Sequence, residues 1–321
     1  MQKKDPEELI KNTRILVTGG AGFIGSHLVD KLLLNNEVII LDNFQTGKLK
    51  NLDKRNKKIK VMRGDVKDYE LVRRCAYDVE YIFHFAATVG VARASTQQIE
   101  VLDTELSGIS NILSTAVENS VKRVIYASSS EAYGNSFDLP YKENSLPTPC
   151  SVYGTAKNTA ELYCKAYSNE YELETVCLRY FNIYGPRQDE RFVISRFIKS
   201  VLSNAPITVY YDGKATRDFT YIDDAVQATI LAAASQKTSG ETINVGTGKE
   251  SEIRELAQQV AELMRGGEIV YTTPSEPRLP EFEVKDRCSD ISKMIKILNY
   301  QPETSFREGL IRTIDWIKEN L

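Results

Sequence analysis

A glycine-rich turn between an apolar run and a helical pattern constrains the fold of this sequence more than any other stretch. Residues 14–28 read RILVTGGAGFIGSHL, so glycines at 19, 22 and 25 link a predicted strand to a predicted helix. In such a unit Gly19 allows the sharp turn, Gly22 lets the backbone approach a pyrophosphate, and Gly25 lets the helix pack against the strand. The unpaired N–H groups that begin the helix can bind the phosphates. The spacing predicts a dinucleotide site; the alternative is a structural turn without a ligand.

A carboxylate ends the second predicted strand, residues 37–42. Asp42 can accept hydrogen bonds from the ribose hydroxyls of the adenosine and would repel a 2′-phosphate. The residues that follow it, Asn43 and Phe44, carry no positive charge. We therefore expect NAD and not NADP, the alternative being an aspartate that only terminates a strand.

Apolar, β-favouring runs alternate with helical patterns over the first half of the chain. The expected strands are 15–18, 37–42, 59–66, 81–87 and 121–127, and the expected helices are 23–34, 70–75 and 95–119. This alternation predicts an α/β fold, a Rossmann-type doubly wound parallel sheet covered on both faces. Ligands of such sheets bind at the carboxyl ends of the strands. Candidate residues at those ends are Asp42, Asp65, Ala86, Ala87, Ser128, Ser129 and Ser130.

From about residue 180 prolines and turns become frequent, and short strands alternate with the expected helices 190–203, 222–236, 251–265 and 304–320. We expect residues 1–180 to form the NAD-binding domain, with 1–12 as an N-terminal extension. Residues 181–321 are expected to form a smaller α/β substrate lobe that is intertwined with the first.

The composition argues against several classes of partner. With 41 basic and 44 acidic residues the formal charge is -3, which indicates neither a nucleic acid nor a membrane surface as partner. No apolar stretch approaches the roughly 20 residues that span a bilayer, and the N-terminus lacks the apolar core of a signal peptide. The five cysteines are scattered without a CxxC pair, which is typical of reduced thiols in a cytoplasmic protein. With two histidines and no carboxylate cluster at ligand spacing, no metal is expected.

A tyrosine and a lysine stand four residues apart in the predicted helix 151–171. This spacing places Tyr153 and Lys157 on one helix face. A tyrosine with a pKa of about 10 is a weak base near neutrality, and a neighbouring ammonium lowers that pKa. The pair could therefore take a proton from a sugar hydroxyl while a hydride leaves the same carbon, with a hydroxyl of Ser128–Ser130 bound to the reacting oxygen. The alternative is an ordinary amphipathic pair.

The motifs TGGAGFIGSH, LDNF, GDV, HFAA, ASSSEAYG, YGTAK, LRYFNIYGPRQ and RDFTYIDD, between residues 14 and 224, resemble the extended short-chain dehydrogenase/reductase superfamily. More narrowly they resemble its NAD-dependent nucleotide-sugar epimerases and dehydratases. The resemblance implies that Tyr153 is the base, Lys157 its partner and Ser129 the hydroxyl residue. It implies cofactor contacts at Gly19, Gly22, Phe23, Ile24, Gly25, Asp42, Asn43, Asp65, Val66, Ala86, Ala87, Tyr153 and Lys157, and substrate contacts at Ser129, Ser130, Asn182, Arg217 and Arg278.

Two positions depart from the pattern of that family. The run Arg278-Leu279-Pro280-Glu281 differs from its usual Arg-Pro-Gly-acid segment. Glu105 stands three residues before Gly108, where the family commonly has an asparagine that contacts the cofactor.

The resemblance leaves the reaction open at Glu131. Dehydratases and decarboxylases of the family have a glutamate there that acts as a base at or near C5 of the sugar, whereas 4-epimerases have a small or hydroxyl residue. Because Ser130 replaces the acid beside that glutamate, and the segments from Asp42 to Gly47 and from His84 to Arg93 are epimerase-like, we favour a UDP-sugar 4-epimerase. Glu131 could instead be a carboxylate at the surface or beside the cofactor. The alternatives are a 4,6-dehydratase, a UDP-glucuronate decarboxylase-type enzyme, or a dinucleotide-binding protein without catalysis. The family also implies a homodimer, for which helices 95–119 and 152–172 are the candidates.

Overall fold

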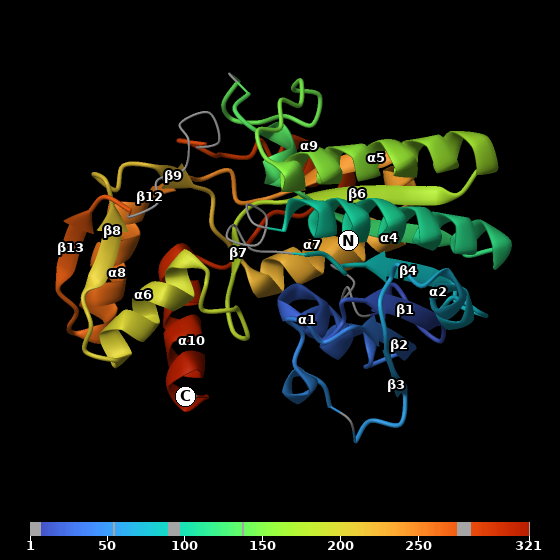
Figure 1. The fold of residues 1–321 in the computed structure, drawn as a ribbon, viewed down its shortest axis with the longest axis horizontal. Helices are drawn as coiled ribbons and strands as arrows, with labels where there is room; N and C mark the ends of the chain where they lie inside the picture. Colours follow the sequence, from blue (N-terminus) through green and yellow to red (C-terminus); the bar gives the residue numbers. More distant parts are fainter. Residues whose placement is uncertain (1–7, 54, 89–96, 137, 275–283, 321) are drawn as a thin grey trace.

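The computed structural model describes residues 8–53, 55–88, 97–136, 138–274 and 284–320. Its centre is a seven-stranded sheet in the order β11-β6-β5-β4-β1-β2-β3, in which every neighbouring pair is parallel (Figure 1). The strands are β1 (Arg14–Thr18), β2 (Glu37–Asp42), β3 (Ile59–Arg63), β4 (Tyr81–His84), β5 (Arg123–Ser129), β6 (Glu174–Tyr180) and β11 (Glu241–Val245). The predicted Rossmann-type sheet is confirmed.

Both faces of the sheet are buried, because successive side chains of each strand point to opposite sides. Ile15 and Val17 of β1 pack in one apolar cluster, and Leu16 packs in another. The helices that cover the Leu16 side are α2 (Tyr69–Cys75), α4 (Gln98–Glu118) and α5 (Val152–Tyr171). The other side is covered by α1 (Phe23–Leu32), α7 (Ile222–Ala234) and α9 (Ser292–Leu298). This burial explains why the strands read as continuous apolar runs.

The predicted elements of the first half of the chain are present, with ends that shift by a few residues. Strand β4 ends at His84 and not at residue 87, and β3 ends at Arg63 and not at 66. Helix α4 begins at Gln98; residues 95 and 96 of the predicted helix lie outside the described residues. Helix α9 was not predicted from the sequence.

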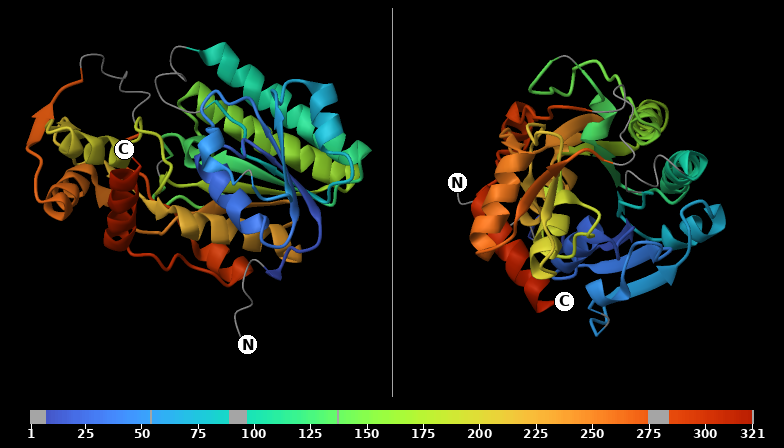
Figure 2. Two further views of the ribbon diagram at one scale, coloured as in Figure 1. Left: turned by 90° about the horizontal axis from the view of Figure 1, so that it is seen from below. Right: turned by 60° about the vertical axis from the view of Figure 1, so that its left-hand side comes forward.

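The C-terminal half contributes to two layers. A second group of elements lies beyond the end of the central sheet (Figures 1 and 2). It comprises α6 (Val193–Leu202), α8 (Ile253–Met264), α10 (Phe306–Glu319) and the parallel pair β8 (Ile207–Tyr210) and β13 (Ile269–Thr272). Short pairs join β7 (Ile183–Tyr184) to β10 (Thr220–Tyr221) and β9 (Thr216–Arg217) to β12 (Ser251–Glu252). Strand β11 belongs to the central sheet, and α7 and α9 pack against it. The chain after residue 180 therefore passes back and forth between the central sheet and the second group of elements.

Three short 3₁₀ segments complete the described secondary structure: η2 (Leu49–Asn51), η3 (Ser130–Tyr133) and η4 (Gln236–Thr238). In the described part of the chain, no helix combines the length and apolarity that crossing a membrane requires.

Candidate functional site

The carboxyl ends of β1, β2, β4 and β5 open into a cavity of about 800 Å³, which residues of the C-terminal half also line. Most residues that the sequence analysis singled out line this cavity. They are Gly19, Gly22, Phe23, Ile24, Gly25, Asp42, Asn43, Asp65, Val66, Ala86, Ala87, Ser129, Ser130, Glu131, Tyr153, Lys157 and Asn182.

The glycine turn brings the backbone of three segments into close contact. Gly19 has a φ of +68°, and a Cβ there would lie 2.7 Å from the backbone nitrogen of Ala86. A Cβ on Gly25 would lie 2.3 Å from the carbonyl oxygen of Gly19, so only glycine lets α1 start this close to the turn. No side chain of the described residues caps the start of α1 at Gly22. The first N–H groups of the helix are thus available to an anion in the cavity.

Asp42 lies where the sequence predicts it, at the end of β2. Its carboxylate accepts the backbone N–H of Ala21 at 2.9 Å and of Phe44 at 2.8 Å. Burial raises the pKa of Asp42, and these two hydrogen bonds lower it. Each carboxylate oxygen keeps a second lone pair for a ribose hydroxyl. Next to it, the Asn43 side-chain amide donates to Asp65 at 3.2 Å and joins the ends of β2 and β3.

Helix α5 presents the predicted base and its partner. The Ser151 hydroxyl caps the helix by accepting the N–H of Gly154 at 3.0 Å, which places Tyr153 in the first turn and Lys157 one turn later. The Lys157 Nζ lies 5.5 Å from the centre of the Tyr153 ring. Ser129, at the end of β5, caps η3 by accepting the N–H of Glu131 at 3.2 Å.

The electrostatics of Tyr153 correct one expectation from the sequence. A lowered pKa was expected from the Lys157 ammonium, but the pKa of Tyr153 is raised. Burial is the largest cause, the charges of Glu105 and Glu131 add to it, and the hydrogen bond with Ser129 acts in the opposite direction. The protein groups alone therefore favour the neutral phenol at Tyr153.

Lys157, the expected partner of Tyr153, is held in a buried ion pair. Its Nζ lies 2.9 Å from Glu105 Oε2, and the two side chains are 2% and 0% exposed. Lys157 also donates to the carbonyl of Ala127 at 2.8 Å, and the Tyr126 hydroxyl donates to the same Glu105 oxygen at 3.1 Å. The sequence marked Glu105 as unusual, but the contact with Lys157 depends on how α4 and α5 pack side by side.

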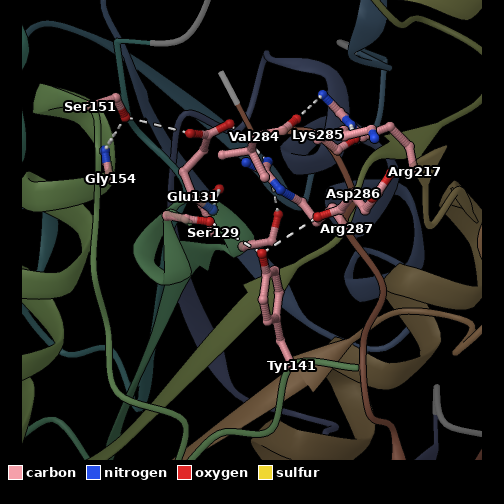
Figure 3. Close-up of polar contacts among 12 residues, drawn as sticks. Ser129, Glu131, Tyr141, Ser151, Gly154, Arg217, Val284, Lys285, Asp286 and Arg287 are labelled. Carbon is pink, nitrogen blue, oxygen red and sulfur yellow. Dashed lines mark hydrogen bonds and ion pairs between the residues drawn. The ribbon is translucent and has the colours of Figure 1, made fainter. Parts of the chain in front are cut away.

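A second ion pair lies at the position of Glu131 (Figure 3). The buried Arg287 places Nη1 2.8 Å from Glu131 Oε1 and 3.4 Å from the Ser130 hydroxyl. The other Glu131 oxygen accepts the Ser151 hydroxyl at 3.4 Å. Arg287 lines the cavity, and the sequence analysis missed it.

Backbone hydrogen bonds between distant segments bring Arg287 to the cavity. Tyr141 donates its N–H to the carbonyl of Cys288 at 2.9 Å, and Asp290 donates to the carbonyl of Tyr141 at the same distance. These bonds bring a segment from the end of the chain to the loop after η3, and nothing near Arg287 in the sequence predicts them.

The sequence predicts three residues that contact the diphosphate or the sugar, and only one of them lines the cavity among the described residues. Asn182 lines the cavity, and its buried Oδ1 has no hydrogen-bond partner among the described residues. The Arg217 guanidinium donates to the carbonyls of Thr216, Val284 and Lys285 at 2.6, 3.0 and 2.9 Å. Arg217 is not among the described residues that line the cavity. Arg278 lies outside the described residues.

A cavity that joins a glycine turn to a Tyr–Lys pair is typical of enzymes that move a hydride between a bound dinucleotide and a hydroxyl-bearing carbon. The chain belongs to the NAD dependent epimerase/dehydratase family, whose sequence model matches residues 15–246. The cofactor is therefore NAD, and the open N–H groups of α1 and the Asp42 carboxylate fit its pyrophosphate and ribose.

Relatives with different reactions are similar to this chain over nearly their whole length. A putative UDP-glucose 4-epimerase of Methanocaldococcus jannaschii is 39% identical, covering 95% of this chain and 99% of the relative. A UDP-N-acetyl-alpha-D-glucosaminuronate decarboxylase of Bacillus cytotoxicus is 37% identical, with 95% and 98% covered. The solved structure of a UDP-glucose 4-epimerase with UDP-glucose from Thermotoga maritima matches with a TM-score of 0.89 and 34% identity over 96% of this chain and 99% of that one.

Proposed function

We propose that this enzyme epimerises C4 of a UDP-linked hexose through a transient 4-keto intermediate. The observation that carries the proposal is the placement of Tyr153, Lys157 and Ser129 around the cavity that the glycine turn opens. The named activities of the M. jannaschii relative and the T. maritima structure support the same reaction.

Each of these side chains has a definable task. The first N–H groups of α1 and the Asp42 carboxylate would hold NAD, which would supply the hydride acceptor and donor for C4 of the sugar. Tyr153 takes the proton of the C4 hydroxyl and later gives it back, while the Ser129 hydroxyl holds the same oxygen. Lys157 donates to Ala127 and Glu105, and its third N–H remains for a hydroxyl in the cavity.

Dehydration across C5 and C6 finds less support in the site. Elimination needs an acid that protonates the departing C6 hydroxyl in addition to a base at C5. Glu131 could be the base, but its neighbour in the sequence is Ser130. A hydroxyl is a far weaker acid than a carboxylic acid, so this chain lacks that group at the position where dehydratases have it.

One observation favours a second candidate, decarboxylation of a UDP-linked uronic acid. A ketone at C4 turns a C5 carboxylate into a β-keto acid, which loses carbon dioxide readily. The buried Arg287 guanidinium, 2.8 Å from Glu131, could bind that carboxylate, and Glu131 could relay a solvent proton to C5 of the enolate that the loss of carbon dioxide leaves. The named activity of the B. cytotoxicus relative supports this candidate.

One experiment separates the two candidates. The purified protein is incubated with UDP-glucose, UDP-N-acetylglucosamine and the corresponding uronic acids, and the products are identified by NMR. A C4 epimer of any of them supports the epimerase. Release of carbon dioxide with a pentose product, lost in Glu131→Gln, establishes the decarboxylase, and recovery of only a 4-keto-6-deoxy sugar contradicts both.

We propose that residues 181–321 act mainly as the substrate lobe and that Asn182, Arg217 and Arg278 contact the diphosphate or the sugar. The unpartnered Oδ1 of Asn182 supports the first of these. Asn182→Ala should raise KM for the nucleotide sugar more than it lowers kcat. A change confined to kcat would remove this role.

We also propose a homodimer through α4 and α5. Apolar and aromatic side chains of α5 are exposed, Leu162 by 61% and Tyr171 by 55%. Sedimentation should show a dimer for the native chain and a monomer for Leu162→Arg.

We also propose a cytoplasmic location. The five thiols, none of them in a disulfide, support a reducing cytoplasmic environment.

A further inference from the structure

The Glu105–Lys157 ion pair is the most deeply buried charge pair next to the proposed reacting groups. Two of the contacts of the Lys157 ammonium are fixed, to Glu105 at 2.9 Å and to Ala127 at 2.8 Å. One Glu105 oxygen also accepts the Tyr126 hydroxyl, and the other, Oε1, has no hydrogen-bond partner among the described residues. A full negative charge thus lies next to the cation that is expected to assist the base.

Other titratable groups around the pair do not balance that charge. From β5, Tyr126 is neutral because burial and Glu105 raise its pKa. From β4, His84 is neutral because burial, and then the Lys157 charge, lower its pKa to about 3. From α5, Tyr153 itself faces the pair; the charge of Glu131 also raises its pKa, and Glu131 is paired with Arg287 at 2.8 Å.

Helix α2 also packs on α4, but its side-chain hydrogen bond to α4 lies farther along that helix. There the Tyr69 hydroxyl donates to Glu118, in the last turn of α4. Among the described residues, the cluster around Tyr153 therefore holds two ion pairs, Lys157 with Glu105 and Glu131 with Arg287, and Lys157 is the cation that lies 5.5 Å from the centre of the Tyr153 ring.

We propose that Glu105 is a positioning residue that neutralises the Lys157 ammonium, so that Tyr153 becomes a base only at a higher pH than beside an unpaired lysine. The proposal rests on the assignment of Tyr153 as the base. It makes position 105 a determinant of the pH at which this enzyme works. A neutral side chain at 105 would leave the full Lys157 charge acting on the phenolate.

Coulomb's law sets the size of the effect. At an effective dielectric constant of about 20, a unit charge several ångströms from the phenolate changes its titration midpoint by roughly one to two pH units. The geometry of Lys157 also depends on Glu105, because its removal leaves a buried ammonium with one fixed partner fewer.

The test titrates Tyr153 directly and needs no sugar. The near-UV phenolate band is followed against pH for the chain with bound NADH, and the same curve for Tyr153→Phe is subtracted, which isolates one of 17 tyrosines. The measurement is repeated for Glu105→Gln, Glu105→Asn and Glu105→Asp, each paired with its Tyr153→Phe double variant. The acidic limb of the pH–kcat profile is recorded for the same proteins on whichever nucleotide sugar they turn over.

We expect Glu105→Gln and Glu105→Asn to titrate about one pH unit or more below the native chain, and Glu105→Asp to stay near it. Glu161→Gln is the matched control, since Glu161 is a buried carboxylate paired with Arg179 at 2.6 Å that does not contact Lys157. It should lose stability without moving the midpoint. Equal midpoints in the native chain and the Gln or Asn variants overturn the proposal.

If the neutral variants do not fold, the native chain alone decides. A Tyr153 signal that is already ionised near neutral pH overturns the proposal, and a phenol that stays protonated there supports it. Failure of the proposed function would appear separately, as absence of turnover on every nucleotide sugar while the titration curves still differ.

Discussion

The two ends of the cavity are built in different ways. At the cofactor end, the groups that face the cavity come from short, continuous segments, the turn at residues 19–25 and the strand end at Asp42, and most contacts involve backbone atoms. At the sugar end, the charged groups are held by side-chain pairs between distant segments, Glu105 with Lys157 and Glu131 with Arg287. The comparison teaches that the groups around the glycine turn are placed by local backbone geometry, whereas the charges around Tyr153 are placed by pairing between distant segments.

The largest expected effect is at the sugar end. Tyr153→Phe removes only a hydroxyl, so kcat should fall by roughly 10²- to 10⁴-fold while folding and NAD content stay nearly native. Steady-state kinetics and the cofactor content of the purified protein measure the two quantities. Native-like kcat would show that another group is the base and that the two ends do not divide the work as described.

At the cofactor end, Gly25→Ala should lower the stability of the fold and the NAD content of the purified protein, the two properties that Tyr153→Phe leaves nearly native. A Cβ there would lie 2.3 Å from the Gly19 carbonyl oxygen, so the turn must shift, at a cost of roughly 1–3 kcal/mol in the free energy of unfolding. The variant should also lose bound NAD on purification. Gly266→Ala is the matched control because its added Cβ meets nothing within 4 Å. Equal NAD retention in both variants would contradict the proposed approach of the backbone to the pyrophosphate.

Arg287→Met sharpens the question of the reaction. If the enzyme is a 4-epimerase, Arg287 touches no atom that reacts, and kcat should fall by about tenfold or less, a change of about 1.4 kcal/mol in the activation free energy. If it is a uronate decarboxylase, release of carbon dioxide should fall by about two orders of magnitude or more, as expected for a lost charge-assisted contact. Product analysis on both substrate types distinguishes the cases, with Arg191→Met, at the cavity rim, as the control.

The smallest expected effect is on the pH dependence of stability, at a contact between α1 and the C-terminal half of the chain. His27 of α1 contacts the carbonyl oxygen of Pro186 through Nε2 at 2.9 Å, and burial lowers its pKa to about 4. The unfolded chain, with the ordinary histidine pKa of about 6.5, therefore binds a proton first as pH falls. Stability that is complete above pH 6.5 should be lost between about pH 6.5 and pH 4, by at most about 3 kcal/mol. Chemical denaturation at several pH values measures how steeply the free energy of unfolding falls as pH falls, and this fall should be smaller in His27→Gln. An unchanged pH dependence would assign the loss of stability to other groups.

The sequence predicted the cofactor end of the cavity better than the charged pairs around Tyr153. The turn at Gly19, the carboxylate at Asp42 and the Tyr153–Lys157 spacing each lie in one short segment, and their local structure appears as predicted. By contrast, Arg287 enters the cavity only because the backbone of Tyr141 pairs with Cys288 and Asp290. The expected lowering of the Tyr153 pKa was wrong because burial raises this pKa most, and the charge of Glu105, forty-eight residues before Tyr153, raises it further.

The sequence by itself determined the parallel sheet, the glycine turn that opens into the cavity and the helix that carries Tyr153 and Lys157. These depend on hydrogen bonds and steric limits between residues close in the chain, which glycine spacing and helical periodicity encode directly. Only the tertiary structure decided which charged side chains pair with one another around the cavity. That result depends on the packing of α4 against α5 and on the return of the C-terminal segment to η3, because a buried charge acquires its partner from whichever segment folds against it.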